Sequence, residues 1–159
     1  MNPYASHVQE QNPLDVIVST PTTLASYVKA LGPTGLGRSL APGKWPVSSI
    51  LCHLADTELA YGFRLRQALA EAHHLIQPFD QDAWSRPYAS LDGTAALEVF
   101  SAIRRWNIAF VHTVPEEAYS RPVTHPERGE LTFRMLLETM AGHDVHHLRQ
   151  IESIAGAAA

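Results

Sequence analysis

The stretch LTFRMLLETMAGHDVHHLRQIESI, residues 131–154, decides the fold that we expect for this chain. Its apolar side chains recur every three or four residues, the spacing that places them on one face of an α-helix. The positions of this heptad-like seam are Phe133, Leu136 or Leu137, Met140, His143 or Asp144, His147, Ile151 and Ile154. Such a seam faces a core of packed helices. It is unusual in carrying histidine where the pattern favours leucine.

Three further segments show the same helical periodicity, namely residues 13–31, 45–71 and 94–113. Within the first segment, Thr20 and Pro21 allow either a helix start or a kink, because threonine caps helices and proline suits a first helical turn. The sequence therefore predicts four helices in all.

The connection over residues 72–93 is too long for a simple up-and-down bundle with short loops. The sequence has no β-branched runs with a period of two, so we expect no β-sheet. These observations predict an all-α fold, a four-helix bundle with a long crossover after the second helix. We expect a single domain over residues 1–159, with frayed ends at residues 1–12 and 155–159.

Composition excludes several classes of function. The 159 residues carry a net charge of −4, and no basic block is present, so we expect no nucleic-acid partner. No apolar run approaches the roughly 18 residues that span a bilayer, and residues 1–13 lack the pattern of a secretory signal. The single cysteine, Cys52, fits a reducing compartment. We therefore expect a cytoplasmic protein without membrane contact.

The histidines on the seam predict a metal site. His143 and His147 are four residues apart, which places both rings on one helix face with their Cβ atoms about 6 Å apart. Such a pair can bind one metal ion, as in the HExxH motif, although HDVHH lacks the glutamate of that motif. The third ligand that we expect is His53, at the edge of the apolar face of the second helix. Three imidazoles leave a coordination position open, which is typical of a catalytic site.

The donor set does not select one metal, because imidazole suits zinc, nickel, copper and iron. We expect a divalent transition metal, with zinc or nickel as the leading candidates. A histidine cluster that packs in the core without metal is the alternative interpretation.

Other residues near these positions are weaker candidates. His146 turns about 100° away from His147, towards the rim of the site or the surface. Cys52 points away from the neighbouring His53, and we expect it to be buried and inert. Gln150 and Trp84 could line the cavity around the metal, and Arg149 could bind a carboxylate of a substrate. For these residues a surface or core role is the simpler interpretation, and the same holds for the remaining histidines, His7, His73, His74, His112 and His125.

Three acidic residues, Asp56, Glu58 and Asp144, follow the predicted ligands closely in the sequence and are candidate helpers of the site. Asp144 is a candidate to orient an imidazole, with a capping or solvated role as the alternative. Glu58 lies on a different helix face from His53, and the alternative to a role in the site is a structural ion pair with Arg64 or Arg134.

At these residues the chain resembles the DinB-like superfamily, which includes bacterial thiol-dependent S-transferases and maleylpyruvate isomerases. The matching pieces are GKWPVSSILCHLADTEL, residues 43–59, and GHDVHHLRQIESI, residues 142–154. The resemblance spans about residues 20–154. It implies a four-helix bundle with up-down-down-up connectivity, a divalent metal on His53, His143 and His147, and a homodimer.

The resemblance also favours one class of reaction, the transfer of a low-molecular-weight thiol such as bacillithiol or mycothiol to an electrophilic small molecule. Two alternatives stay open. A metal-dependent hydrolase that uses metal-bound water would need a carboxylate base close to the metal. A non-catalytic, dimeric bundle with a structural metal, or with none, would need no such base. No catalytic residue beyond the three ligands is identified.

Overall fold

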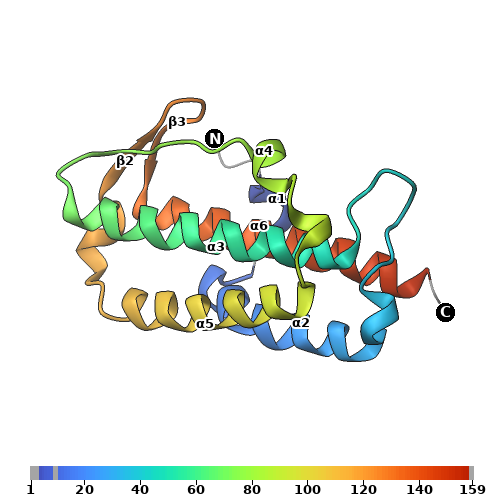
Figure 1. Cartoon of the computed structure of the whole chain (residues 1–159). Coiled ribbons are helices and arrows are strands. Elements are labelled where there is room, and N and C mark those ends of the chain that lie inside the picture. The colour runs from blue at the N-terminus through green and yellow to red at the C-terminus, as the bar shows by residue number, and fades with distance from the viewer. Residues whose placement is uncertain (1–3, 9–10, 158–159) are drawn as a thin grey trace.

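The computed structural model describes residues 4–8 and 11–157, and four long helices dominate it (Figure 1). These helices are α2 (Pro13–Gly35), α3 (Val47–Ala70), α5 (Gly93–Val111) and α6 (Phe133–Gly156). They coincide with the four predicted segments to within a few residues. The predicted all-α class and the four-helix bundle are thereby confirmed.

The helices run in an unusual order of directions. In Figure 1, α2 and α6 run one way along the bundle, and α3 and α5 run the other way. Because α3 and α5 are consecutive and parallel, the chain between them must return along the bundle. Residues 71–92 make this long crossover, which includes the short helix α4 (Gln81–Ser85) and a 3₁₀ turn at Tyr88–Ser90. The up-down-down-up connectivity is therefore confirmed.

The first long helix starts at Pro13, not at Thr20. Asn12 caps it, since its side-chain oxygen accepts a backbone N–H of the first turn. The helix continues through Pro21, and Gly32, with φ of 63°, is its one non-helical residue. This positive φ favours glycine, which explains why the regular helix predicted for residues 13–31 stops there.

The expectation that the chain lacks β-structure is wrong. β2 (Pro122–His125) and β3 (Gly129–Thr132) form an antiparallel hairpin, and β1 (His74–Leu75) pairs in parallel with β2. The strands are two to four residues long, too short to show a period of two. The pairing of β1 with β2 also joins residues far apart in the sequence. The hairpin leads directly into α6 and lies at one end of the bundle (Figure 1).

The bundle core consists of two apolar clusters. One is built around Leu65, Phe133 and Leu137, and the other around Leu24, Phe100 and Ile151. A group of buried polar side chains occurs at intermediate positions along α3, α5 and α6, comprising His53, Glu58, Arg104, Asn107, His143, Asp144 and His147. Burial of each large apolar side chain contributes about 1.5–3 kcal/mol to folding. The two clusters therefore hold the helices in place around the polar group.

The described part of the N-terminal segment packs on the bundle. Residues Ala5–Val8 form the short helix α1, which packs against α6, and Val8 is buried. Frayed ends are expected at residues 1–12 and 155–159. Of these, residues 1–3, 9–10 and 158–159 lie outside the described residues. Among the helices described, none combines the length and hydropathy of a membrane span.

Candidate metal centre

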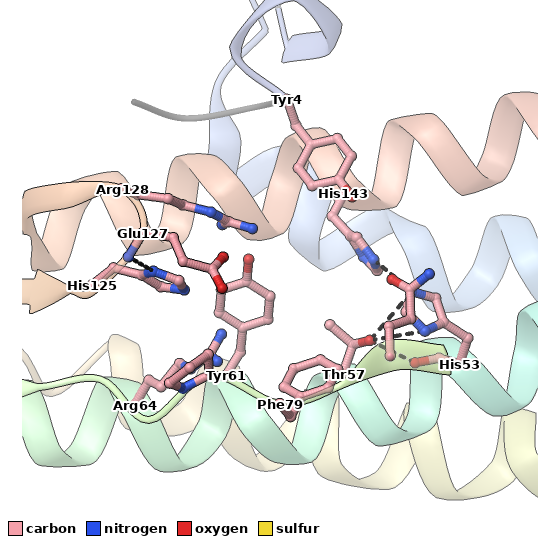
Figure 2. A pocket seen from close by; sticks show the side chains of 12 residues that line it. Tyr4, His53, Thr57, Tyr61, Arg64, Phe79, His125, Glu127, Arg128 and His143 are labelled. Atoms are coloured by element: carbon pink, nitrogen blue, oxygen red, sulfur yellow. Dashed lines mark hydrogen bonds between the residues drawn. The ribbon is translucent and has the colours of Figure 1, made fainter. Parts of the chain in front are cut away.

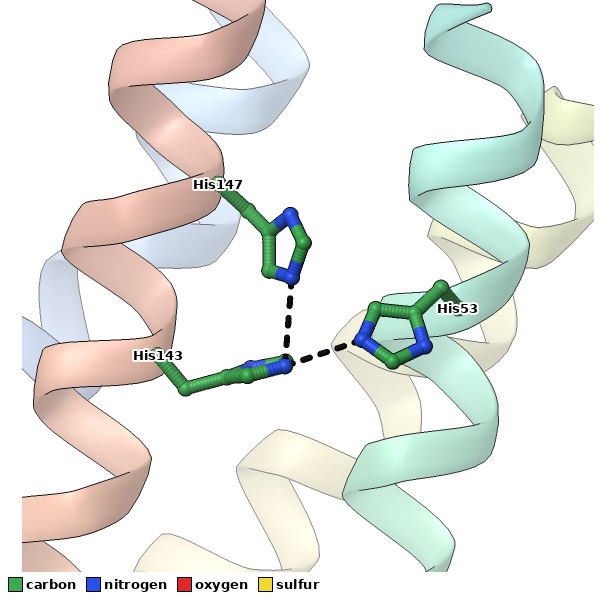
Figure 3. Close-up of side chains that lie close together, drawn as sticks. All are labelled: His53, His143 and His147. Atoms are coloured by element: carbon green, nitrogen blue, oxygen red, sulfur yellow. Dashed lines mark hydrogen bonds between the residues drawn. The ribbon is translucent and has the colours of Figure 1, made fainter. Parts of the chain in front are cut away.

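The three predicted ligands meet between two antiparallel helices. His53 projects from α3, while His143 and His147 project from successive turns of α6 (Figure 3). All three side chains are buried, with 2 to 5% of their surface exposed. The four-residue spacing brings the α6 pair together, and the packing of α3 beside α6 supplies the third ring.

The geometry of the cluster fits one metal ion. His143 Nε2 lies 2.9 Å from His53 Nε2 and 3.2 Å from His147 Nε2, and all three candidate donor atoms lie within 4.8 Å of one another. A tetrahedral ion with metal–nitrogen bonds of about 2.0–2.1 Å would hold its nitrogen ligands about 3.3 Å apart. In a neutral ring, each Nε2 carries either one proton or one lone pair, so hydrogen bonding among the three is incomplete. A single cation would satisfy three lone pairs at once.

The cluster is held in its neutral form. Burial, with a smaller contribution from repulsion by neighbouring histidines, lowers the pKa of His53 to about 4 and that of His147 to about 3. Burial also lowers the pKa of His143 well below its ordinary value, with repulsion from His147 and His53 adding to the effect. Because metal ligation requires the neutral imidazole, the rings are prepared for it at neutral pH.

Gln150 fixes the tautomer of one ring. His147 Nδ1 lies 2.7 Å from Gln150 Oε1, which can only accept, so Nδ1 carries the proton and Nε2 keeps its lone pair. On α3, the Thr57 hydroxyl donates to the carbonyl oxygen of His53 at 2.7 Å and lies 3.5 Å from its ring. The bond from His147 shows that Gln150 supports the site, and Gln150 also lines a cavity beside the cluster.

The acidic residues predicted near the site have a different partner. Arg104 of α5 binds Asp144 through both Nη atoms, at 2.5 and 3.1 Å, and binds Glu58 at 2.8 Å. Asp144 does not orient an imidazole, and the expected partners of Glu58, Arg64 and Arg134, are wrong. Burial opposes the charge on Arg104, but the two carboxylates outweigh it and raise the pKa of the guanidinium.

Sequence analysis missed this buried network, although a signal was present. Arg104 and Asn107 fall on the apolar seam of α5, which otherwise consists of Leu97, Phe100 and Val111. A charged and an amide side chain at core positions indicate a buried polar partner. Arg104 also donates to the carbonyl oxygen of Ile17 at 3.0 Å, and so links its own helix to the other three helices of the bundle.

Two cavities flank the histidine cluster. The ligand cavity, as we name it, has a volume of about 200 Å³; its wall includes His53 and His143, and it extends to Tyr61, Arg64 and Arg128 (Figure 2). The outer cavity has a volume of about 440 Å³ and is lined by residues that include Trp45, His146, His147 and Gln150. Tyr4 and Gln81 line both. The cluster is therefore reached from two sides.

Tyr4 covers the cluster, which the sequence did not indicate. Its ring lies edge-on to His143 with 5.3 Å between centroids. This approach depends on Gly142, because a Cβ atom there would lie 2.5 Å from the Tyr4 carbonyl oxygen. The signal that could have revealed the contact is the glycine inside a long helix, next to a predicted ligand.

The weaker candidates lie around the site or away from it. His146 is half-buried beside Tyr4 and His7, and Cys52 is buried, as expected. His74 is buried, because it enters β1 and contacts Glu71. His125 lines the ligand cavity.

Three further candidates lie outside the two cavities. Trp84 lines neither cavity, and its ring stacks on the ring of Phe79. Exposed Arg149 contacts His7, and exposed His112 caps the end of α5.

Comparison with known proteins places the chain in a family. Residues 17–151 match the sequence model of the DinB superfamily. A protein of Oceanobacillus iheyensis named "Putative metal-dependent hydrolase" is 27% identical over 142 residues, covering 89% of this chain and 83% of that protein. YfiT of Bacillus subtilis, which has the same description, is 25% identical over 154 residues, covering 94% and 86%.

Solved structures share the fold. The structure of YfiT from Bacillus subtilis, described as "a probable metal-dependent hydrolase with an unusual four-helix bundle topology", has a TM-score of 0.85 at 23% identity and covers 94% of this chain and 87% of that one. A mycothiol-dependent maleylpyruvate isomerase has a TM-score of 0.69 at 15% identity, covering 87% and 59%. Because the family match covers far more than half of the sequence, the chain belongs to the DinB superfamily.

Proposed function

We propose that this protein is a metal-dependent enzyme in which His53, His143 and His147 hold one divalent transition metal, zinc or nickel. The observation that carries this proposal is the convergence of three neutral, buried Nε2 atoms within 4.8 Å. A metal bound there would supply Lewis acidity, which polarises a substrate oxygen and lowers the pKa of a bound thiol or water. Three protein ligands also leave room for a small molecule in the coordination sphere.

The favoured reaction is the transfer of a low-molecular-weight thiol to an electrophilic small molecule. Two cavities, of about 200 and 440 Å³, reach the cluster from different sides. A two-substrate reaction needs two such spaces, whereas hydrolysis needs one space and a water molecule. The thiol-dependent isomerase that shares the fold supports this class of reaction.

Hydrolysis is the second candidate, and the names of the relatives from Oceanobacillus iheyensis and Bacillus subtilis favour it. It calls for a carboxylate base within one water of the metal. Asp144 and Glu58 are engaged by Arg104, and Asp56 accepts a hydrogen bond from Tyr88 at 2.7 Å. Among the described residues that line the ligand cavity, Glu127 is the one carboxylate, and it lies at the end away from His53 and His143 (Figure 2), so a base beside the cluster is missing from this lining.

Elemental analysis of protein purified without an affinity tag tests the metal site. We expect about one metal per chain, lost in His147→Ala and retained in the matched control His112→Ala, whose side chain is exposed at the end of α5. Equal metal content in the two variants would contradict the proposal. Loss of metal together with loss of folding would instead favour a structural metal in a non-catalytic bundle.

Activity assays separate the two reactions. Loaded protein should conjugate a model electrophile with bacillithiol or mycothiol, and omission of the thiol should stop turnover. Turnover of esters or amides without thiol, abolished by His147→Ala, would replace the transferase by the hydrolase.

The remaining expectations belong to the same proposal. The composition and the family resemblance are consistent with four of them. These are a small-molecule substrate, the absence of a nucleic-acid partner, a homodimer and a cytoplasmic location. Light scattering at several concentrations would test the dimer, which requires twice the mass of one chain.

A further inference from the structure

The ligand cavity has a second end that the metal site does not use. Opposite His53 and His143, the guanidinium groups of Arg64 and Arg128 face the same space (Figure 2). Arg64 comes from α3, and Arg128 comes from the turn of the β2–β3 hairpin. Two cations from separate elements therefore converge on a cavity of about 200 Å³.

Arg64 is an unusual cation because it is buried without an acidic partner. Its side chain is 8% exposed, and among the residues that the structure describes no carboxylate lies within ion-pair distance of it. Nη2 donates to the carbonyl oxygen of Gln77 at 3.2 Å, and the guanidinium lies over the rings of Tyr61 and Phe79. These contacts hold the group in place but leave most of its five N–H donors for a ligand.

The charges at this end are predominantly positive. Arg128 is half-buried. The pKa of Arg64 is lowered mainly by the burial of Arg64, and repulsion from the nearby Arg128 adds to this effect. His125 is buried and neutral, because burial and the two arginines lower its pKa. Glu127 is the single carboxylate here among the described residues, and it is exposed to solvent, which weakens its field. An anion placed between the two guanidinium groups would be attracted by both of their charges.

The spacing of the two ends suits a small molecule. His53, Thr57, Tyr61 and Arg64 form one stripe along α3. Eleven residues of helix span about 16 Å between the Cα atoms of residues 53 and 64, and side chains extend into this distance from both ends. The cavity volume equals the share of about seven water molecules at roughly 30 Å³ each.

We propose that Arg64 and Arg128 form a binding site for an oxyanion group, carboxylate or phosphate, on the small-molecule substrate that reacts beside His53 and His143. Guanidinium groups bind both oxyanions through paired, charge-assisted hydrogen bonds. The assignment of the anion to a substrate rests on the proposed function, whereas the binding of the anion itself does not.

Calorimetry on metal-free protein near neutral pH tests the site without any turnover. The probes are succinate, inorganic phosphate and neutral succinamide. We expect succinate or phosphate to bind with a Kd below about 10 mM and succinamide not to bind. The two anions together decide which oxyanion is preferred. A wild-type protein that binds neither anion would overturn the proposal.

Three variants locate the anion. Arg64→Gln and Arg128→Gln should each weaken the binding by at least threefold, and about tenfold is expected for loss of one charged contact. Arg105→Gln, which removes an exposed arginine of α5, is the matched control and should bind as wild type. Unchanged binding in both cavity variants, or equal weakening in the control, would refute the site.

A conservative variant and a metal titration complete the design. Arg64→Lys keeps the charge and should retain more affinity than Arg64→Gln; if Arg64→Gln does not fold, Arg64→Lys and Arg128→Gln decide. Titration of the same preparations with zinc and with nickel separates the two proposals. Anion binding by a protein that binds neither metal would leave the anion site standing and remove the proposed metalloenzyme. Metal binding without anion binding would do the opposite.

Discussion

His147 donates its Nδ1 proton to Gln150 Oε1 across 2.7 Å, one turn further along α6, and thereby turns an unprotonated Nε2 towards His143. A glutamine three residues after a histidine thus acts as its orienting partner. Because the bond lies within one helix, it is in place before any metal binds.

Replacing Gln150 should weaken the metal site without removing a ligand. Loss of a partner that orients a metal-bound histidine typically costs 10- to 100-fold in affinity. We expect about tenfold weaker zinc binding in Gln150→Leu, measured by competition with a chromogenic chelator. Gln150→Glu keeps the acceptor and should bind zinc at least as tightly as wild type. Equal affinity in the leucine variant would show that the bond is irrelevant to the metal.

Zinc should stabilise the fold, because it binds the folded chain. At a free concentration of 100 times Kd, the gain is about 2.7 kcal/mol. For a chain of this size we expect a rise in Tm of roughly 5–10 °C, reversed by chelator and followed by circular dichroism. His147→Ala should show no rise. A similar rise in that variant would place the stabilising zinc elsewhere.

Arg104→Leu should be strongly destabilising. The change leaves Glu58 and Asp144 buried as unpaired charges, since both are almost fully covered by protein. Breaking one side of a buried ion pair costs about 3–5 kcal/mol. Urea unfolding should show this loss, while Arg105→Leu, at the exposed neighbouring position, should change stability by less than about 0.5 kcal/mol. Similar stability of the two variants would mean that the network contributes little.

Gly142→Ala should release the N-terminal segment from α6. The new methyl group would lie 2.5–2.6 Å from backbone and Cβ atoms of Tyr4. Hydrogen exchange read by mass spectrometry should show faster exchange of the His7 amide, which bonds to the Tyr4 carbonyl oxygen. Gly156→Ala, where the methyl group meets no atom within 4 Å, is the control. Unaltered exchange in Gly142→Ala would show that the segment accommodates the methyl group.

Periodicity determined the helices and one face of the site. The spacing of apolar residues located α2, α3, α5 and α6, and the four-residue interval placed His143 and His147 together. Both features depend on local helix geometry, which the sequence carries within a few residues. His53 could be named as a candidate, and the packing of α3 beside α6 then brought its ring within 2.9 Å of His143. Binding of metal by these rings stays a prediction.

Only the tertiary structure decided which polar groups meet. Glu58 and Asp144 lie 86 positions apart in the sequence, and Arg104 joins them because its long side chain reaches from α5 into the bundle interior, where both carboxylates lie. Short strands, the cover formed by Tyr4, and the convergence of Arg64 with Arg128 likewise depend on long-range packing. The sequence by itself determines which side chains share a face of one helix. Which faces then meet follows from how all the helices bury their apolar surface together, and no local pattern records that outcome.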